Sequence, residues 1–477
     1  MAERIIGRII EKALLSRLLE SDEPELLALY GRRRVGKTFL IRNAYEKHII
    51  FECTGIHQAT MQKQLENFLA SIREAGDVQT ITGKINWIQA FQILIECIKP
   101  KIARKKQVLF FDEFPWFNTH RSGFLQAFDH FWNTWASRQN NLVVVICGSA
   151  ASWMIRNVVN NRGGLHNRIT SKIRLMPFSL SEVEGFLRMR NVRLDRYQVL
   201  QVYMVMGGVP QYLKEIRSGE SSTQAIDRTC FTKDGFLRDE FRNLYYSLFE
   251  EGSKHIEIIQ ALARKSSGLT RNEIIITCGL SSGGRTTLLL DELAESGFIA
   301  GTIPFNKTSK DAVFRLTDEY SHFYLRFMEH SKVQGPGSWI RYSRETSWKS
   351  WSGYAFESIC IKHILQLKRR LGIDGVYTEA STWRSSAKDK DGAQIDLLID
   401  RQDRCINICE IKFSIGEFVI SNSYATELEK KLEVFRSRTQ TNKTLFLTMI
   451  TTFGVKESEN KTRVVQNEIR MDALFEQ

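Results

Sequence analysis

Eight consecutive residues, GRRRVGKT at positions 31–38, combine glycines, a lysine and a hydroxyl in a spacing that suits phosphate binding. They fit G-x-x-x-x-G-K-[ST] in full, between an apolar strand-like run and a helical pattern. The glycines let main-chain N–H groups close around phosphates, Lys37 can reach the β- and γ-phosphates, and the Thr38 hydroxyl can ligate Mg²⁺. The alternative is a glycine-rich turn with a solvated lysine. We predict ATP and Mg²⁺ binding by Gly31, Arg32, Arg33, Arg34, Val35, Gly36, Lys37 and Thr38.

Acidic and hydroxyl residues follow two further apolar runs. The run QVLFF ends in Asp112 and Glu113, and the run NLVVVICG ends in Ser149. Ligands of open α/β sheets collect at the carboxyl ends of strands, so we expect these side chains to face the phosphates. Asp112 would hold the magnesium shell, Glu113 would orient the attacking water, and Ser149 would sense the γ-phosphate. The alternative for an isolated acidic pair is a solvated strand end.

A polar loop, NNRGGLHNR, carries two arginines ahead of another strand pattern. Arg162 or Arg168 could bring positive charge to the γ-phosphate, from within the chain or from a neighbouring copy. An exposed loop arginine is commonly just solvated, which is the alternative for each. Ser179 and Glu182 have the spacing of a capping box, which predicts that a helix begins there.

Ionisable residues also interrupt apolar runs in the last third of the chain. Glu357 lies in a helical pattern, Asp396 in AQIDLLID, and the pair Glu410 and Lys412 in CINICEIKF. Burying such groups is costly unless they are paired or bind a metal. Carboxylates that hold Mg²⁺, beside a lysine that stabilises charge on phosphate, are what a magnesium-dependent nuclease requires. We predict catalytic roles for all four and metal binding by Asp396 and Glu410; the alternative is a buried salt-bridge network in a fold that does not cut.

Particular elements must position these residues. In the first part of the chain, strands alternate with helices, which predicts a mostly parallel sheet. In the last part, a helix would place Tyr354, Glu357, Ile361 and Ile364 on one buried face. The runs around Asp396 and Glu410 would return through RQDR as an antiparallel hairpin, and the second would be a central strand because both of its faces are largely apolar.

Between these parts, three helical patterns and two strand patterns occur in the order of a winged helix. The third helix would present Arg285, Thr286 and Thr287 to the DNA major groove, with Lys307 and Lys310 on the wing. The alternative is a rigid lever that packs on the first domain and touches no nucleic acid.

Composition limits the class of protein. Lys and Arg number 67 against 54 Asp and Glu, so the net charge of +13 suits a polyanionic partner. The eight cysteines form no C-x-x-C pair, which predicts reduced thiols. Because the longest apolar stretch falls short of the roughly 20 residues of a membrane helix, we expect a cytoplasmic protein without membrane contact. The length suggests several domains, which we place at 1–178, 179–250, 251–332 and 338–477.

The segments IIGRIIEKALL, VLFFDEFPW, VICGSAASWM, LMPFSL and MGGVPQYL, with the phosphate loop, resemble the bacterial and archaeal ATPase family of the AAA+/STAND group over nearly the whole chain. The resemblance implies that Gly7, Arg8 and Glu11 lie near the nucleotide base and that the turn of Gly208 and Pro210 closes over the nucleotide. The Glu, Asp and Glu-x-Lys set resembles the PD-(D/E)xK nuclease pattern, without the proline before Asp396. Nuclease-like C-terminal domains of this kind accompany many members of that ATPase family.

The sequence thus predicts an α/β protein: a parallel-sheet P-loop ATPase domain, a helical lid and winged helix, and an α/β restriction-endonuclease-like domain. Its expected function is ATP binding and slow ATP hydrolysis, coupled to DNA engagement and a magnesium-dependent nuclease. The alternative is a nucleotide-gated switch that binds DNA or a protein without cleaving. A homo-oligomer is compatible with both.

Overall fold

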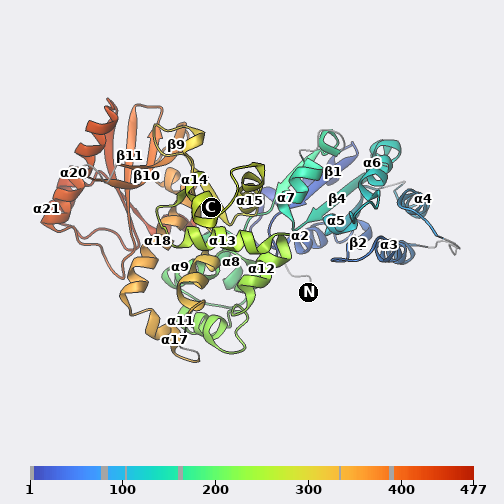
Figure 1. The fold of residues 1–477 in the computed structure, drawn as a ribbon, viewed down its shortest axis with the longest axis horizontal. Coiled ribbons are helices and arrows are strands. Elements are labelled where there is room, and N and C mark those ends of the chain that lie inside the picture. Colours follow the sequence, from blue (N-terminus) through green and yellow to red (C-terminus); the bar gives the residue numbers. More distant parts are fainter. Residues whose placement is uncertain are drawn as a thin grey trace. The chain divides into compact units, whose positions relative to one another are not determined.

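The computed structural model describes residues 5–76, 84–102, 105–159, 165–331, 335–385 and 392–476 (Figure 1). The chain divides into two compact units, residues 1–177 and 178–477. The finer division of the second unit into three domains stays a prediction. Within the described ranges, no helix is both long and apolar enough to span a bilayer.

The first unit contains the predicted parallel sheet, in the order β2-β3-β4-β1-β5. Its strands are β1 (Glu25–Tyr30), β2 (Ile49–Thr54), β3 (Gln107–Asp112), β4 (Leu142–Gly148) and β5 (Ser171–Arg174). The central strands β3, β4 and β1 are apolar and buried along most of their length, as expected for a parallel sheet covered on both faces. Because β4 lies between β1 and β3, the strand ends that carry the phosphate loop and the acidic pair flank it.

Period-two alternation assigns the strand side chains to two cores. Leu26 and Ala28 face one core, and Leu27 and Leu29 face the other. The first core also receives apolar residues of α3 (Met61–Ala75), α4 (Trp87–Ile98), α5 (Phe114–Phe117) and α6 (Phe124–Thr134); the second receives α1 (Ile9–Glu20) and α2 (Lys37–Ala44). The remaining helical pieces are α7 (Ala151–Met154), η1 (Ala136–Arg138), η2 (Ile155–Val159) and η3 (Leu165–Asn167).

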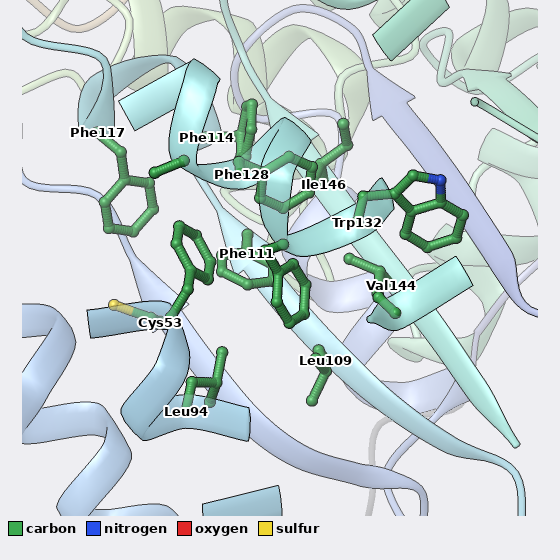
Figure 2. Close-up of a cluster of buried hydrophobic side chains, with 14 of the residues drawn as sticks. Cys53, Leu94, Leu109, Phe111, Phe114, Phe117, Phe128, Trp132, Val144 and Ile146 are labelled. Carbon is green, nitrogen blue, oxygen red and sulfur yellow. The ribbon is translucent and has the colours of Figure 1, made fainter. Parts of the chain in front are cut away.

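Aromatic rings fill the first core next to the acidic strand end. Figure 2 shows Phe111, Phe114 and Phe128 gathered around the end of β3. Phe114 packs edge-on against Phe111 and Phe128, with ring centroids 6.4 and 4.9 Å apart. This packing fixes the backbone on either side of Asp112 and Glu113, because buried rings of this size leave little room for movement.

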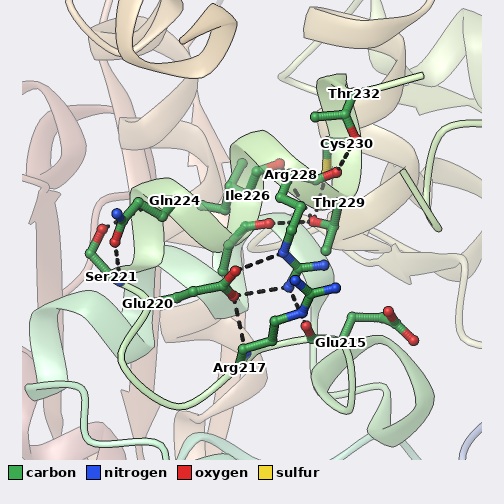
Figure 3. Close-up of polar contacts among 11 residues, drawn as sticks. Glu215, Arg217, Glu220, Ser221, Gln224, Ile226, Arg228, Thr229, Cys230 and Thr232 are labelled. Atoms are coloured by element: carbon green, nitrogen blue, oxygen red, sulfur yellow. Dashed lines mark hydrogen bonds and ion pairs between the residues drawn. The ribbon is translucent and has the colours of Figure 1, made fainter. Parts of the chain in front are cut away.

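The second unit begins with short helices: α8 (Leu180–Met189), α9 (Arg196–Met206), α10 (Pro210–Leu213), α11 (Ser222–Ile226), η4 (Asp227–Phe231) and α12 (Glu240–Leu248). The predicted capping box opens α8, where Ser179 N donates to Glu182 Oε2 at 2.9 Å and Ser179 Oγ accepts from Glu182 N. Figure 3 shows how Arg228 grips the Glu220 carboxylate with two hydrogen bonds of 2.7 and 2.9 Å. This bidentate pair fixes the turn between α10 and α11.

A segment of three helices and a small antiparallel sheet follows, which we call the helix-and-wing segment (residues 251–331). Its helices are α13 (Gly252–Ala263), α14 (Arg271–Cys278) and α15 (Gly284–Glu295), and its sheet has the order β6-β8-β7. The strands are β6 (Leu269–Thr270), β7 (Ile299–Thr302) and β8 (Val313–Leu316), with η5 (Ser309–Asp311) between the last two. The helices α16 (Glu319–Phe323) and η6 (Tyr324–Met328) complete it. The three helices and the β7–β8 hairpin occur in the predicted order, whereas β6 was not predicted; the winged-helix assignment stays a prediction.

The chain between the third and fourth predicted domains packs against preceding helices where the structure describes it. Residues 332–334 lie outside the described ranges, but Gly337 N and Trp339 N each donate to the buried Asp227 carboxylate at 2.7 Å. The Trp339 ring stacks on Phe231 with centroids 5.9 Å apart. Charge-assisted hydrogen bonds therefore anchor the start of the last predicted domain to the preceding helices.

The last part of the chain is a five-stranded mixed sheet, β13-β12-β11-β10-β9. Its elements are α17 (Ser338–Tyr342), α18 (Thr346–Lys362), α19 (Ile364–Arg370), β9 (Thr378–Arg384), β10 (Gln394–Arg401), β11 (Cys405–Lys412), α20 (Asn422–Thr439), β12 (Thr444–Thr451), α21 (Glu459–Val464), β13 (Asn467–Arg470) and η7 (Met471–Phe475). β10 and β11 form the predicted antiparallel hairpin, and β11 is central as predicted.

One expectation for this region is wrong. The helix that carries Glu357 ends at Lys362, and α19 starts at Ile364, so Ile364 does not continue the predicted face. The buried residues of α18 include Ala355, Phe356 and Ile359, whereas Tyr354 and Ile361 are half-buried. The break occurs where His363 accepts a hydrogen bond from Leu180 N at 3.1 Å, a tertiary contact that periodicity does not reveal.

Candidate functional site

The phosphate loop joins β1 to α2 in the predicted strand-to-helix setting. Gly31 has φ +153°, and a Cβ there would lie 2.3 Å from the Leu175 carbonyl oxygen. Gly36, with φ +91°, is the N-cap of α2. Both positions need glycine for local reasons: close backbone approach at the first and left-handed conformation at the second. Since α2 begins at Lys37, its N-terminal N–H groups and dipole favour an anion at the loop.

Lys37 is buried inside this loop. Its Nζ donates to the carbonyl oxygens of Gly31 and Arg32, both at 2.9 Å. Burial lowers the pKa of Lys37, and nearby groups that include the Glu113 and Asp112 carboxylates oppose that shift. The ammonium group is thus oriented by main-chain carbonyls, which leaves its charge available to a phosphate.

Thr38 and Asp112 meet across the strand ends, as the magnesium assignment requires. Thr38 Oγ1 donates to Asp112 Oδ2 at 2.8 Å, and the N–H of Glu113 donates to Asp112 Oδ1 at 3.0 Å. Burial raises the pKa of Asp112, while the Thr38 hydrogen bond favours the ionised form and reduces the shift. A hydroxyl and a carboxylate oxygen are ligands that Mg²⁺ prefers, so these two residues fit a magnesium ion bound with phosphates.

Glu113 has a backbone conformation outside the usual helical and strand regions. Its φ of 46° places it in the left-handed region as the N-cap of α5. Its Oε2 accepts hydrogen bonds from Ser149 Oγ at 2.7 Å and Ser149 N at 3.1 Å. The structure therefore brings together the acidic residue and the hydroxyl that were predicted to act on the γ-phosphate.

Sequence reasoning missed Cys147, a buried thiol at the end of β4 near Asp112. Burial raises its pKa well above the ordinary value for a thiol. Cys147 and Ser149 are two positions apart at the end of β4, so period-two alternation was the available signal. The thiol therefore stays protonated and adds no charge near Asp112.

Two further loop contacts involve arginines. Arg8 Nη2 donates to the Val35 carbonyl oxygen at 3.4 Å, which brings the N-terminal segment against the phosphate loop. The Arg33 guanidinium lies over the Trp116 ring, 5.8 Å from its centroid. Arg33 therefore links the phosphate loop to the segment that follows the acidic pair. This cation–π contact has no sequence signature.

The other nucleotide residues predicted from sequence remain predictions. Arg168 is exposed after η3, and Arg162 lies outside the described residues. Gly208 and Pro210 belong to the second unit, where Gly208 O accepts from Phe178 N at 2.7 Å. A Cβ on Gly208 would lie 1.9 Å from Phe178 O, so this glycine is required by packing within its own unit.

In the second unit, the predicted acidic residues converge at one end of the hairpin. The last paired residues of β10 and β11 are Leu397 and Cys409, which lie opposite each other. Asp396 and Glu410 are the next residues beyond this pair, one on each strand. Asp396 Oδ2 accepts from Ile411 N at 3.2 Å. Burial and the neighbouring Glu410 and Glu357 carboxylates raise the pKa of Asp396 to about 7. We call Glu357, Asp396 and Glu410 the acid cluster.

Basic groups occupy both oxygens of Glu410. Lys412 Nζ lies 2.8 Å from Oε1, Lys431 Nζ lies 2.6 Å from Oε2, and the Tyr424 hydroxyl donates to Oε1 at 2.7 Å. Burial alone would raise the pKa of Glu410, but the two ammonium groups outweigh it, so the pKa lies below its ordinary value. Lys431 and Tyr424 come from α20 and were missed, because nothing in their local sequence marks them.

Glu357 also has a basic partner. Arg315 Nη1, from β8, lies 2.7 Å from Glu357 Oε1, and both side chains are largely buried. Burial raises the pKa of Glu357, and the guanidinium opposes the shift. Within the described ranges, no three His, Cys, Asp or Glu side chains are arranged to hold a metal ion. The acid cluster is compensated by protein cations in this conformation.

The predicted DNA-reading residues of α15 differ in their exposure. Thr286 is only 1% exposed, and its hydroxyl donates to Ser281 O at 2.6 Å, so the expectation that it faces DNA is wrong. Its hydroxyl instead forms a hydrogen bond within the turn that precedes the helix. Arg285 and Thr287 are exposed, although Arg285 pairs with Glu251. Lys307 and Lys310 are exposed on the turn between β7 and β8.

Comparisons with known proteins address the first part of the chain most directly. Residues 8–216 match the family model of an ATPase domain found predominantly in Archaea. An uncharacterized protein of Methanocaldococcus jannaschii is 21% identical over 414 residues, which are 86% of this chain and 87% of that protein. A Walker-type ATPase of Pyrococcus abyssi has a TM-score of 0.50 at 18% identity, covering 68% of this chain and 96% of that one. The ORC2 protein of Aeropyrum pernix has a TM-score of 0.45 at 14% identity, covering 68% and 94%.

Proposed function

We propose that this chain, which carries a P-loop ATPase domain, binds ATP at residues 31–38 and hydrolyses it slowly as a switch. The observation that carries the proposal is the arrangement at the ends of β3 and β4. Thr38 bonds Asp112, and Ser149 bonds Glu113, beside a buried Lys37. Phosphate-binding, cation-binding and water-orienting groups thus lie at one sheet edge.

Each residue has a separate role in this proposal. Lys37 and the N-terminus of α2 bind phosphate oxygens, and Thr38 with Asp112 would hold Mg²⁺, which would supply positive charge to those oxygens. Glu113 orients water for attack, and Ser149 competes with that water for the Glu113 carboxylate. Hydrolysis is slow in this account because Glu113 must first give up two hydrogen bonds from Ser149.

The test is ATP hydrolysis and ATP binding by the wild type and Glu113→Gln. Glutamine keeps the size of the side chain but cannot act as a base, so hydrolysis should fall about 100- to 1,000-fold while binding is retained. Thr54→Ser, a small change at the end of neighbouring β2, is the matched control and should keep both properties. Equal hydrolysis by Glu113→Gln and the wild type would reject the assignment.

DNA engagement by the helix-and-wing segment is part of the proposal. It is supported by the net charge of +13 and by the exposed Arg285, Lys307 and Lys310. If the wing contacts phosphates, Lys307→Ala with Lys310→Ala should weaken duplex binding and reduce the salt slope by about 2. Binding with an unchanged salt slope would instead favour a segment that acts as a lever without touching nucleic acid.

For the second unit, we propose a magnesium-dependent nuclease-like site at the acid cluster and Lys412. The specific support is that Asp396 and Glu410 lie one residue beyond the paired part of one hairpin, and that the Glu357 carboxylate is close enough to raise the pKa of Asp396. Cleavage of plasmid and single-stranded DNA with Mg²⁺, by the wild type and Asp396→Asn, with and without ATP, tests it. Cleavage that is lost in Asp396→Asn would support the nuclease.

A switch that does not cleave is the second candidate. It is favoured by the engagement of both Glu410 oxygens with Lys412, Lys431 and Tyr424. In that case ATP hydrolysis would be intact while no nucleic acid is cut under any condition, and Asp396→Asn would change stability alone. The two candidates share the ATPase and differ only in the acid cluster.

A further inference from the structure

Helix α18, which carries Glu357, is attached to the segment that runs from β8 into α16. The Tyr354 hydroxyl donates to Leu316 O at 3.1 Å, and Lys362 Nζ lies 2.5 Å from Glu319 Oε1. Between them, Arg315 forms its 2.7 Å ion pair with Glu357. These contacts lie at successive turns of α18, so this helix is mounted on the helix-and-wing segment as well as on its own sheet.

Arg315 is placed by the wing sheet rather than by the C-terminal sheet. It lies on β8, the middle strand of β6-β8-β7, opposite Ala300 of β7. Its side chain is 13% exposed and that of Glu357 is 14% exposed, so water screens the pair poorly. Any shift of the wing sheet against α18 must therefore lengthen or break a strong ion pair.

The charges of the acid cluster are balanced before any metal ion arrives. Glu357 pairs with Arg315, and Glu410 pairs with Lys412 and Lys431, whereas Asp396 accepts a hydrogen bond from Ile411 N. The two lysines lie on β11 and α20, which belong to the same sheet domain as Asp396 and Glu410. Arg315 differs because it comes from β8 of the helix-and-wing segment, outside the C-terminal sheet.

We infer that Arg315 is the contact through which the helix-and-wing segment withholds the Glu357 carboxylate from a divalent cation. The inference rests on the proposed metal site, which it deepens by naming its regulation. A guanidinium and a metal ion compete for the same carboxylate oxygen, and their like charges repel across a poorly screened site. A partner that moves the wing, such as a DNA duplex, would release Glu357 toward the acid cluster.

The experiment is calorimetric titration with Mn²⁺ alone, without nucleotide, using the full chain. Arg315→Met should raise Mn²⁺ affinity by about tenfold or more, because it frees the Glu357 oxygen that Arg315 binds in the wild type. Arg315→Lys, which keeps the charge, should stay near the wild type. The urea unfolding transition of each variant reports whether the second unit, which contains Arg315, is folded.

Lys362→Met is the matched control, because it removes a neighbouring ion pair between α18 and α16 without touching Glu357. Unchanged affinity in Lys362→Met, with the gain confined to Arg315→Met, supports the inference. Equal gains in both variants would mean that loosening α18 is enough, and no gain in Arg315→Met would mean that Arg315 does not compete; either result overturns it. If Asp396→Asn in the Arg315→Met background leaves Mn²⁺ binding unchanged, the cation lies elsewhere, and the proposed metal site itself fails.

Discussion

The phosphate loop and the acid cluster both collect charged side chains at a strand end, but they use them differently. In the first, Lys37 is held by main-chain carbonyls and Asp112 by the Thr38 hydroxyl. In the second, Glu410 pairs with Lys412 and Lys431, and Glu357 pairs with Arg315. Neutral partners orient the charges of the first site, whereas opposite charges neutralise Glu357 and Glu410 in the second.

This difference matters for ligand binding. A charged side chain that is hydrogen-bonded to neutral groups is oriented but not neutralised. A phosphate or a metal ion can therefore bind it without first breaking an ion pair. A charge held in a buried ion pair must lose its partner first, and that loss is expensive in a poorly hydrated site. The phosphate loop is thus prepared for its ligand, and the acid cluster is closed until a basic group withdraws.

The largest expected effect comes from removing the ammonium group of Lys37 from the phosphate loop. Lys37→Ala should weaken ATP binding by about 2–5 kcal/mol, because a buried charge that binds phosphate is truncated. Calorimetry with ATP measures it. Arg42→Ala, on the exposed face of the same helix, is the control and should bind as the wild type does. Unchanged binding in Lys37→Ala would remove the contrast between the two sites.

The next effect concerns the hydroxyl that orients Asp112. Thr38→Ala should weaken magnesium-dependent ATP binding about 10- to 100-fold, since it deletes a hydrogen bond to a charged group and a predicted metal ligand. Thr38→Ser keeps the hydroxyl and should restore most of the affinity. If ATP affinity with Mg²⁺ were the same in the alanine and serine variants, the hydroxyl would have no part in cation binding.

Acid should weaken the second unit through His363. Burial lowers the pKa of His363 to about 4, and its Nε2 must stay unprotonated to accept from Leu180 N. The unfolded chain takes up this proton near pH 6.5 and the folded chain does not. Stability is therefore present above pH 6.5 and is lost as the pH falls toward 4, by about 2 kcal/mol between pH 7 and 5.

Urea unfolding of the wild type and His363→Gln at both pH values measures this loss. Glutamine can offer a donor and an acceptor but does not titrate, so its stability should change less between pH 7 and pH 5. The same pH dependence in both proteins would assign the acid sensitivity to other groups. ATP binding, which depends on the first unit, reports whether that unit stays folded.

The smallest expected effect sharpens the description of the closed site. Lys431→Met leaves Glu410 with Lys412 and Tyr424, so the free energy of unfolding should fall by about 1–2 kcal/mol rather than by the full cost of an orphaned charge. Lys265→Met removes an exposed pair with Glu273 and should cost under about 0.5 kcal/mol. Equal losses would show that the acid cluster is solvated like a surface pair.

Local patterns predicted much of this molecule. The phosphate loop, the acidic strand end and the parallel sheet follow from residue types at short spacing, and the comparisons support an ATPase domain. The hairpin that carries Asp396 and Glu410 also follows from two apolar runs across a polar turn. These features need few contacts beyond their own strands.

The failures involve long-range contacts. Arg315 lies on strand β8 and Glu357 on helix α18, and they are separated by 42 positions, so no rule of sequence spacing predicts their contact. Lys431 reaches Glu410 because α20 covers β11, and Thr286 is buried because its hydroxyl closes a turn. Sequence reasoning identified the acids of the second site and Lys412, but not Lys431 or Arg315.

The most direct test of the account counts tightly bound Mn²⁺ by electron paramagnetic resonance, for the wild type with and without ATP. We expect one tight Mn²⁺ with ATP, held at the phosphate loop, and much weaker binding without nucleotide because the acid cluster is closed. Tight binding without nucleotide that Asp396→Asn abolishes would contradict the account, since it would mean that the acid cluster is as open as the phosphate loop.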